Sequence, residues 1–399
     1  MRSGTFVKQA SGYDAFIPRP LPPDPPVQID SEMAHLLSEA DRALGRLDGI
    51  TSVLPNPDLF VGMYVRQEAV LSSQIEGTQS TLEDVLQFEI DAGGESVPKD
   101  VGEVVNYVRA MNYGLDRLDK LPLSLRLIRE IHAELLRGAR GGNREPGEFR
   151  RTQNWIGPTG CNLKTAIFVP PPVPEMKEAI GELEKFLHFE GPMPALIHCG
   201  LAHAQFETIH PFLDGNGRVG RLLIAFLLCE RKILHRPLLY LSRYLKRHRS
   251  QYYDRLTAIR TEGDWEGWLK FFLRGVAEVS QTATETAHKI LVLREEGRKL
   301  KAVGYSALMQ RLFDYLFEQP MFNVRMVEKH LGCSFAKANQ LVSVLEESGL
   351  LQETTGWQRN RRYKFWPYLA LFEEKSSHAA QGEWVPDKAI EPSGGTAKG

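Results

Sequence analysis

The sequence has few cysteines and no long hydrophobic run. Its four cysteines are scattered and form no Cys-x-x-Cys pair: Cys161, Cys199, Cys229 and Cys333. This argues against a disulfide framework and favours reduced thiols. The longest apolar run extends only from Leu222 to Cys229, whereas a membrane helix needs about 20 such residues. The first residues also lack the apolar stretch of a signal peptide. We therefore expect a cytoplasmic protein that has no membrane partner.

An excess of charge of one sign is also missing. The 399 residues include 49 Lys+Arg and 50 Asp+Glu, for a net charge of −1. A globally basic nucleic-acid coat is thereby excluded, although a local basic patch is not. The hydrophobic fraction of 42% and charged fraction of 25% are those of a folded protein. At about 150 residues per domain, this length suggests two to three domains.

Helical periodicity dominates the chain, so the predicted fold class is mainly α. Six prolines between residues 16 and 26 predict an extended arm, and the rest of the first third reads as helix only. Between residues 141 and 174, glycine, proline and polar residues predict a long loop that carries a small β-hairpin. The expected helices cover residues 31–47, 59–75, 82 onward, 101–118, 123–136, 175–189, 193–209, 221–231, 247–262 and 265–293.

One short segment, His210-Pro-Phe-Leu-Asp-Gly-Asn-Gly-Arg-Val-Gly-Arg221, carries chemistry. A Gly-Asn-Gly turn that enters a helix leaves backbone N–H groups free to bind an anion. Arg218 and Arg221 share one helix face and suit forked contacts with phosphate. Asp214 is a hard oxygen ligand for Mg²⁺, and His210 can accept a proton. Each part alone is more often structural, but together they indicate phosphoryl or nucleotidyl transfer.

This segment resembles the Fic-family signature His-x-Phe-x-[Asp/Glu]-Gly-Asn-Gly-Arg-x-x-Arg and matches it at every fixed position. The resemblance covers residues 15–295 and implies a helical Fic core. It also implies transfer of AMP from ATP to a Ser, Thr or Tyr hydroxyl of a protein. In-line attack on the α-phosphorus needs positioning and charge stabilisation more than covalent help.

The resemblance assigns the first half of the motif to proton and metal chemistry. His210 is then the catalytic general base, and Phe212 anchors the loop in the core. Asp214 is then the ligand of the metal ion, which is Mg²⁺ or, as an alternative, Mn²⁺.

The resemblance assigns the second half of the motif to nucleotide binding. The backbone of Gly215, Asn216 and Gly217, with the Asn216 side chain, binds near the α-phosphate. Arg218 contacts the α- and β-phosphates, and Arg221 contacts the γ-phosphate.

A second motif, Ser72-Ser-Gln-Ile-Glu76-Gly77, resembles the inhibitory sequence of Fic proteins whose inhibitory helix precedes the core. Glu76 would pair with Arg221 and occupy the place of the γ-phosphate, so that ATP binds only unproductively. Because a buried ion pair is costly to break on one side, such a pair can act as a switch. On its own, the pattern is weak and favours a surface glutamate at a helix end.

Residues 154–172 look like the family's target-binding flap. Main-chain groups of five residues would add an extended target segment as a strand, whatever its sequence: Thr165, Ala166, Ile167, Phe168 and Val169.

The segment Arg249-Ser-Gln-Tyr-Tyr253 resembles the part of the fold that lines the adenine pocket. Tyr253 is the candidate for adenine contact, with Tyr252 and Arg260 as weaker ones. The alternative is that the two tyrosines belong to an amphipathic core face.

Residues 305–372 predict three helices followed by a hairpin, which resembles a winged helix-turn-helix. A basic stretch near residue 295 would be the linker before it. Basic and aromatic side chains on the wing suit a phosphate backbone, but such domains also mediate dimers and protein contacts. The wing residues are Trp357, Arg359, Arg361, Arg362, Tyr363, Lys364 and Trp366.

We therefore predict four regions. Residues 1–118 form the arm and the helical N-terminal region with the inhibitory helix, 119–295 the catalytic core, 305–372 the winged helix and 373–399 a disordered tail. The predicted function is that of an autoinhibited protein adenylyltransferase that also modifies itself. Alternatives are a hydrolase that removes AMP from proteins, an enzyme using another nucleotide donor, and a DNA-binding regulator with a nucleotide-sensing core. A homodimer and DNA are further partners left open.

Overall fold

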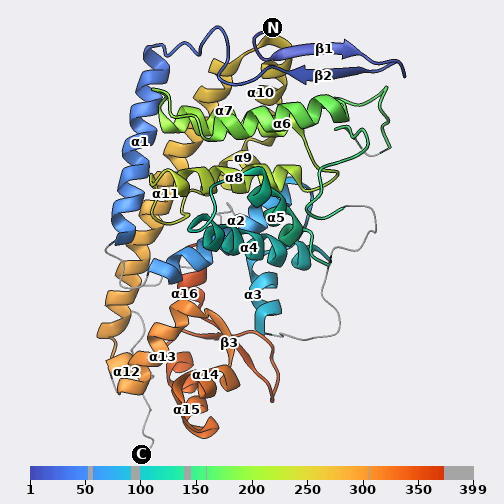
Figure 1. The fold of residues 1–399 in the computed structure, drawn as a ribbon. Coiled ribbons are helices and arrows are strands. Elements are labelled where there is room, and N and C mark those ends of the chain that lie inside the picture. Colours follow the sequence, from blue (N-terminus) through green and yellow to red (C-terminus); the bar gives the residue numbers. More distant parts are fainter. Residues whose placement is uncertain (53–56, 91–98, 139–144, 159, 305, 373–399) are drawn as a thin grey trace, which may run out of the picture. The chain divides into compact units, whose positions relative to one another are not determined.

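The computed structural model describes residues 1–52, 57–90, 99–138, 145–158, 160–304 and 306–372. Most of its regular structure is helical (Figure 1), which confirms the predicted fold class. Two compact units are present. The first comprises residues 1–53, 63–85 and 96–284, and the second residues 54–62, 86–95 and 285–399. The four predicted region boundaries stay a prediction.

The first unit begins with a hairpin that the sequence reading missed. Strands β1 (Gly4–Lys8) and β2 (Asp14–Pro18) pair antiparallel, with Thr5 opposite Ile17. The prediction of an all-helical first third was therefore wrong. The strand was missed because the apolar pair Phe16-Ile17 is short and stands next to prolines, which are rare inside strands. Phe16 is fully buried, and its N–H donates to the Val169 carbonyl at 3.0 Å.

Two helices at the centre of the first unit are almost entirely buried. In α7 (Ala195–Ile209), every residue from Leu196 to Ile209 is buried, and α8 (Asn216–Glu230) packs beside it (Figure 1). A helix that is buried on all sides lies in the interior of the protein, and the polar side chains His203 and Glu207 are buried with α7. The segment 210–215 is the short connection between these two helices, so the core itself positions it. The helices up to residue 299 are α1 (Ser31–Ser52), α2 (Pro57–Ile75), α3 (Leu82–Ile90), α4 (Lys99–Leu118), α5 (Leu125–Leu135), α6 (Val173–Leu187), α7 (Ala195–Ile209), α8 (Asn216–Glu230), α9 (Ser242–Arg247), α10 (Arg249–Glu262) and α11 (Trp265–Lys299).

Most predicted helices lie where the periodicity placed them, with three departures. The short helix α9 was not predicted. Helix α8 begins at Asn216 rather than at Arg221, so the Asn-Gly of the motif is the first turn of the helix. Helix α11 continues to Lys299 instead of ending at Leu293, so the basic stretch near residue 295 is helical, and its Arg294 and Arg298 both pair with Asp314.

The expected flap hairpin is reduced to one pairing. Within residues 145–158 and 160–172, the only β-type contact is an isolated antiparallel bridge between Ile156 and Phe168. The predicted long loop is therefore present, and the predicted small hairpin is limited to that one bridge. The prolines of the segment explain this limit, since they cannot donate to a ladder.

The second unit contains the three predicted helices and an additional strand. Strand β3 (Met321–Asn323) precedes the second of these helices and joins β4 (Gln352–Glu353) and β5 (Arg362–Lys364) in an antiparallel sheet of order β3-β5-β4. Whether this unit is a winged helix stays a prediction, and the tail 373–399 lies outside the described residues. Among the described helices, none is both long and apolar enough to cross a bilayer. The elements are α12 (Lys301–Gly304), α13 (Ala307–Glu318), β3 (Met321–Asn323), α14 (Val324–Leu331), α15 (Phe335–Glu347), β4 (Gln352–Glu353), β5 (Arg362–Lys364) and α16 (Trp366–Leu369).

Candidate active site

His210 closes α7 in a backbone conformation unusual for a histidine. Its φ of 50° and ψ of 59° are left-handed, and the next helix is reached through Gly215 at φ 78°. Burial lowers the pKa of His210 to about 3, and the positive charges of Arg260 and Arg150 act in the same direction. Nδ1 of this imidazole is buried and has no hydrogen-bond partner among the described residues. A neutral imidazole with an uncommitted nitrogen is able to accept a proton.

Asn216 holds the turn together from inside. Its Oδ1 accepts the Phe212 N–H at 2.8 Å, and its Nδ2 donates to the Phe212 carbonyl at 2.8 Å. Both residues are buried. The predicted contact of the Asn216 side chain with the α-phosphate region does not fit this arrangement, because the amide is committed to the backbone. Its own N–H, in the first turn of α8, is the group left for an anion.

His132, a residue that the sequence reading missed, supports the turn from α5. Its Nδ1 accepts the Gly147 N–H at 2.9 Å, so Nε2 carries the proton and donates to the Asp214 carbonyl at 3.0 Å. Its ring stacks on Phe212, with centroids 3.7 Å apart. Burial lowers the pKa of His132 to about 4. The one available signal was a histidine on the apolar face of α5, four residues after Ile128.

The N-terminus of α8 presents backbone donors. The Val219 N–H donates to the Gly215 carbonyl at 3.0 Å, so the helical ladder starts there. The N–H groups of Asn216, Gly217 and Arg218 precede it and are those that a helix offers to an anion. The Gly215 N–H, predicted to join them, instead donates to Asp214 Oδ1 at 2.7 Å.

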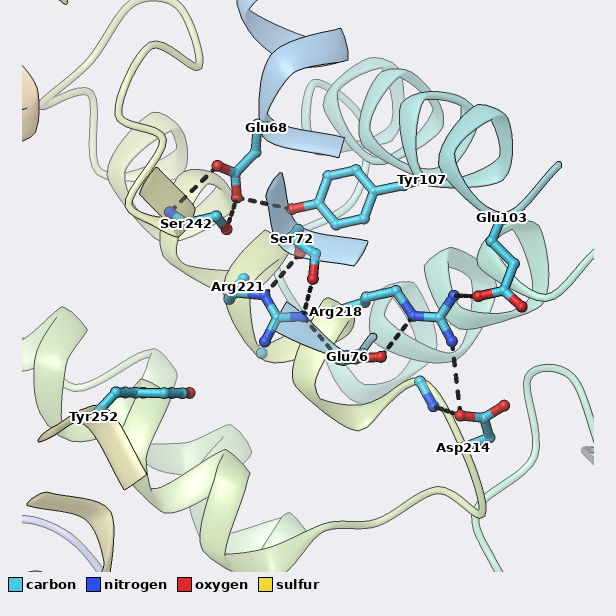
Figure 2. A network of polar contacts seen from close by, with 12 residues as sticks. Glu68, Ser72, Glu76, Glu103, Tyr107, Asp214, Arg218, Arg221, Ser242 and Tyr252 are labelled. Atoms are coloured by element: carbon cyan, nitrogen blue, oxygen red, sulfur yellow. Dashed lines mark hydrogen bonds and ion pairs between the residues drawn. The ribbon is translucent and has the colours of Figure 1, made fainter. Parts of the chain in front are cut away.

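Glu76 connects the two arginines of the motif (Figure 2). Its Oε1 lies 2.7 Å from Arg221 Nη2, and its Oε2 lies 3.0 Å from Arg218 Nε. Ser72, one turn earlier on α2, accepts from Arg221 Nε through Oγ at 2.7 Å and from Nη2 through its carbonyl at 3.0 Å. A Cβ at position 217 would stand 2.5 Å from Glu76 Oε1, so only glycine admits the carboxylate this close. The structure thus brings together residues far apart in sequence, as predicted for Glu76 and Arg221.

Arg218 is surrounded by carboxylates. Besides Glu76, Glu103 of α4 contacts Nη1 at 3.0 Å and Asp214 lies 3.6 Å from Nη2. The arginine side chain is only 3% exposed. The sequence reading did not single out Glu103, because it stands in a mixed stretch of α4 with no motif around it.

Glu68, on the same helix as Ser72, lies beside this cluster (Figure 2). It accepts hydrogen bonds from the Tyr107 hydroxyl at 3.2 Å and from the Ser242 hydroxyl and N–H. Burial raises the pKa of Glu68 to about 7, against the opposing effect of these donors and of Arg221. Helix α2 is therefore anchored by a buried polar group two turns before Glu76.

Asp214 is the predicted metal ligand, and its surroundings fit a cation only in part. Its carboxylate is about one third exposed and lies next to the helix N-terminus. Among the described residues, no group of three or more His, Cys, Asp or Glu side chains converges on one point. A Mg²⁺ ion held by one carboxylate, waters and phosphate oxygens would suit such a site.

Side chains in and just before the flap donate hydrogen bonds to the backbone of the motif, and the flap residue Phe168 is buried. Arg150 Nε donates to the His210 carbonyl at 3.1 Å, and Asn154 Nδ2 donates to the Phe212 carbonyl at 2.9 Å. Phe168 is buried beneath Arg260, whose guanidinium carbon lies 3.7 Å from the ring centroid. Arg260 thus contacts the flap, and its predicted contact with adenine stays a prediction.

Of the five flap residues predicted to present main-chain groups, four have main-chain partners within the chain. The Thr165 N–H donates to the Asn162 carbonyl at 3.0 Å. The N–H groups of Ile167 and Phe168 both donate to the Ile156 carbonyl, and the Val169 carbonyl accepts from Phe16. The Ile167 side chain, in contrast, is 72% exposed.

The two tyrosines of helix α10 lie in different environments. Tyr252 is buried, and its hydroxyl donates to His203 Nε2 at 3.0 Å, while His203 Nδ1 donates to the Gly220 carbonyl at 2.9 Å. Tyr252 is therefore a core residue. Tyr253 is 42% exposed and stacks under Arg249, so its predicted contact with adenine stays a prediction.

Comparison with known proteins agrees with this architecture. Residues 34–116 match the Fic/DOC family N-terminal model, and residues 122–228 match the Fic/DOC family model. The chain is 32% identical over 206 residues to the protein adenylyltransferase Fic of Drosophila grimshawi, covering 49% of this chain and 38% of that protein. It is 28% identical over 240 residues to the protein adenylyltransferase Fic of Culex quinquefasciatus, covering 56% and 43%. The chain thus spans about two fifths of the length of these relatives.

A crystal structure of a Fic family protein from Desulfovibrio desulfuricans G20 shares the fold. It superposes with a TM-score of 0.58 at 20% identity, covering 85% of this chain and 97% of that one. Residues 34–116 and 122–228 thus match the two Fic/DOC family regions, and the chain has a mainly helical Fic fold.

Proposed function

We propose that the protein is an adenylyltransferase that transfers AMP from ATP to a Ser, Thr or Tyr hydroxyl of proteins, itself included, and that Glu76 inhibits it in cis. The observation that carries this proposal is the position of Glu76. Its two carboxylate oxygens stand beside both motif arginines and the N-terminus of α8, which is where phosphate oxygens would bind.

In the proposed reaction, the target hydroxyl attacks the α-phosphorus of ATP. The hydroxyl proton moves to the neutral imidazole of His210, the new O–P bond forms, and pyrophosphate leaves with the electrons of the broken bond. Arg218, Arg221 and the first N–H groups of α8 would hold the phosphates and stabilise the charge that develops on them. Asp214 would hold Mg²⁺ or Mn²⁺, which would neutralise phosphate charge when bound.

Autoinhibition follows from competition for the arginines. Arg221 is buried, and Glu76 and Ser72 occupy its donors, so a triphosphate must displace the Glu76 carboxylate. Leaving either charge of such a pair buried without a partner is strongly unfavourable. The switch would therefore need either a competing phosphate or a partner that moves α2.

Transfer of labelled AMP from ATP, with Mg²⁺, tests the proposal. Wild type, Glu76→Gly and Glu76→Gly/His210→Ala are compared. We expect strong self-labelling only in the single variant. If no variant labels itself or a lysate, but pre-labelled protein loses AMP when Glu76 is present, the protein is a hydrolase of the same bond. No change in either direction would favour another donor or a regulator.

DNA binding, a homodimer and a cytoplasmic location remain predictions from sequence. On the predicted wing, Arg362 stacks over Trp357 at 5.3 Å, and Arg361 lies 4.0 Å from Glu346. Since these two cations have partners in their own unit, no observation favours DNA over a protein partner.

A further inference from the structure

Arg218 uses different nitrogens for its three carboxylate partners. Nε faces Glu76 at 3.0 Å, Nη2 faces Asp214 at 3.6 Å, and Nη1 donates to Glu103 at 3.0 Å. Figure 2 shows Glu103 on one side of the guanidinium, with Glu76 and Asp214 toward the other. The side chain is 3% exposed, so water does not replace these partners.

The guanidinium is planar, so its N–H groups point in fixed directions. The Nε–H and one N–H of Nη2 point in the same direction and form the edge that binds two oxygens of one anion. Glu76, the inhibitory group, and Asp214, the proposed metal ligand, are the ion-pair partners of these two nitrogens, but Nε makes no hydrogen bond to the described residues. Nη1 lies on the opposite side and contacts Glu103 alone among the described carboxylates. Departure of Glu76 would therefore open the two-oxygen edge without disturbing the Glu103 contact.

Helix α4 holds Glu103 in place. Tyr107 lies one turn further on and is fully buried, with its hydroxyl on Glu68. Residues four apart project from one helix face, so burial of Tyr107 fixes the direction in which Glu103 points. α4 also packs against α8, which carries Arg218.

The geometry points to Glu103 as a positioning residue. It holds Arg218 by Nη1 and keeps the Nε–Nη2 edge turned toward the triphosphate after Glu76 leaves. This inference rests on the proposed transfer of AMP. It differs from a second inhibitory role, in which Glu103 would compete with phosphate as Glu76 does.

Kinetics in the released protein test this role. In the Glu76→Gly background, Glu103→Ala should lower kcat about tenfold, because a charge-assisted hydrogen bond that orients the arginine is lost. Glu103→Gln should restore most of it, since the amide oxygen still accepts from Nη1. Asp116→Ala, on an exposed position of the same helix, is the matched control. In the chain that retains Glu76, Glu103→Ala should not raise self-labelling above wild type.

Two kinetic outcomes overturn the inference. Self-labelling that rises in Glu103→Ala with Glu76 intact would make Glu103 a second inhibitory acid. Equal kcat and KM for Glu76→Gly with and without Glu103→Ala would show that Glu103 does not position Arg218.

A readout that needs no ATP separates this inference from the proposed function. In protein labelled with ¹⁵N-arginine, the Arg218 Nε–H signal is assigned by its loss in Arg218→Lys. We expect it to broaden in Glu76→Gly/Glu103→Ala and to sharpen again in Glu76→Gly/Glu103→Gln. That pattern in a protein that transfers no AMP would refute the function and retain the positioning role. An unchanged signal in the alanine variant would refute the role.

Discussion

Replacing Asn216 by alanine should loosen the turn that carries His210. In the folded protein, Asn216 Oδ1 accepts the Phe212 N–H, and Nδ2 donates to the Phe212 carbonyl. After Asn216→Ala the Phe212 carbonyl still accepts from Asn154 Nδ2 at 2.9 Å, but the buried Phe212 N–H has lost its acceptor. An orphaned buried donor costs about 1–3 kcal/mol, and loss of the second bond adds about 1 kcal/mol. Alanine is a good helix former, so helix propensity does not add to the loss.

The net expectation is that opening of this turn becomes easier by about 2–4 kcal/mol, so the Phe212 amide should exchange with solvent about 30- to 900-fold faster. Hydrogen exchange followed by mass spectrometry, on peptides that contain Phe212, measures this directly. Asn112→Ala on the exposed face of α4 serves as the control and should change nothing in those peptides. If Asn216→Ala keeps wild-type exchange but no longer binds ATP, the side chain is a phosphate ligand and our reasoning is wrong.

Three further predictions concern the flap and the buried titratable groups. Arg260→Leu removes the cation over Phe168 and should destabilise the flap by about 1–2 kcal/mol, seen as faster amide exchange over residues 165–170; unchanged exchange would contradict it. The pKa of Glu68 is raised from 4.5 to about 7, so the unfolded chain releases this proton first and stability should fall as pH rises from about 4.5 to 7. Glu68→Gln should flatten that decline in urea unfolding, and an unaltered slope would show that the carboxyl is ionised when folded. The pKa of His132 is lowered from 6.5 to about 4, so between these values the unfolded chain binds a proton that the folded chain does not, and stability should fall as the pH falls through this window. His132→Gln should therefore reduce the pH dependence of the free energy of unfolding there by one proton.

Much of the fold follows from local patterns. Apolar periodicity predicted most helices in both units, because side chains three and four apart must share a face whatever surrounds them. The failures have local causes as well. The β1–β2 hairpin is too short and too rich in neighbouring prolines to show a strand pattern, and α9 is a six-residue helix with no repeat to recognise. The flap was predicted as a hairpin because its residues favour strands, but only one bridge forms.

The chemistry of residues 210–221 was contained in the chain itself. A base, an acid, a helix N-terminus and two arginines stand within one continuous segment, so their meeting needs no tertiary fold beyond a turn between two helices. Glu76 was predicted as their partner only through resemblance, since nothing in its own neighbourhood requires a partner 145 positions away.

Tertiary packing decided how those groups are used. It set His132 under the turn, committed the Asn216 amide to the Phe212 backbone, and brought Glu103 to the far side of Arg218. These assignments depend on distances between helices that are remote in sequence, and hydrogen bonds operate only within about 3.5 Å. A residue type and its spacing state what a side chain is able to do, whereas burial and neighbours select which of its atoms remain free to do it.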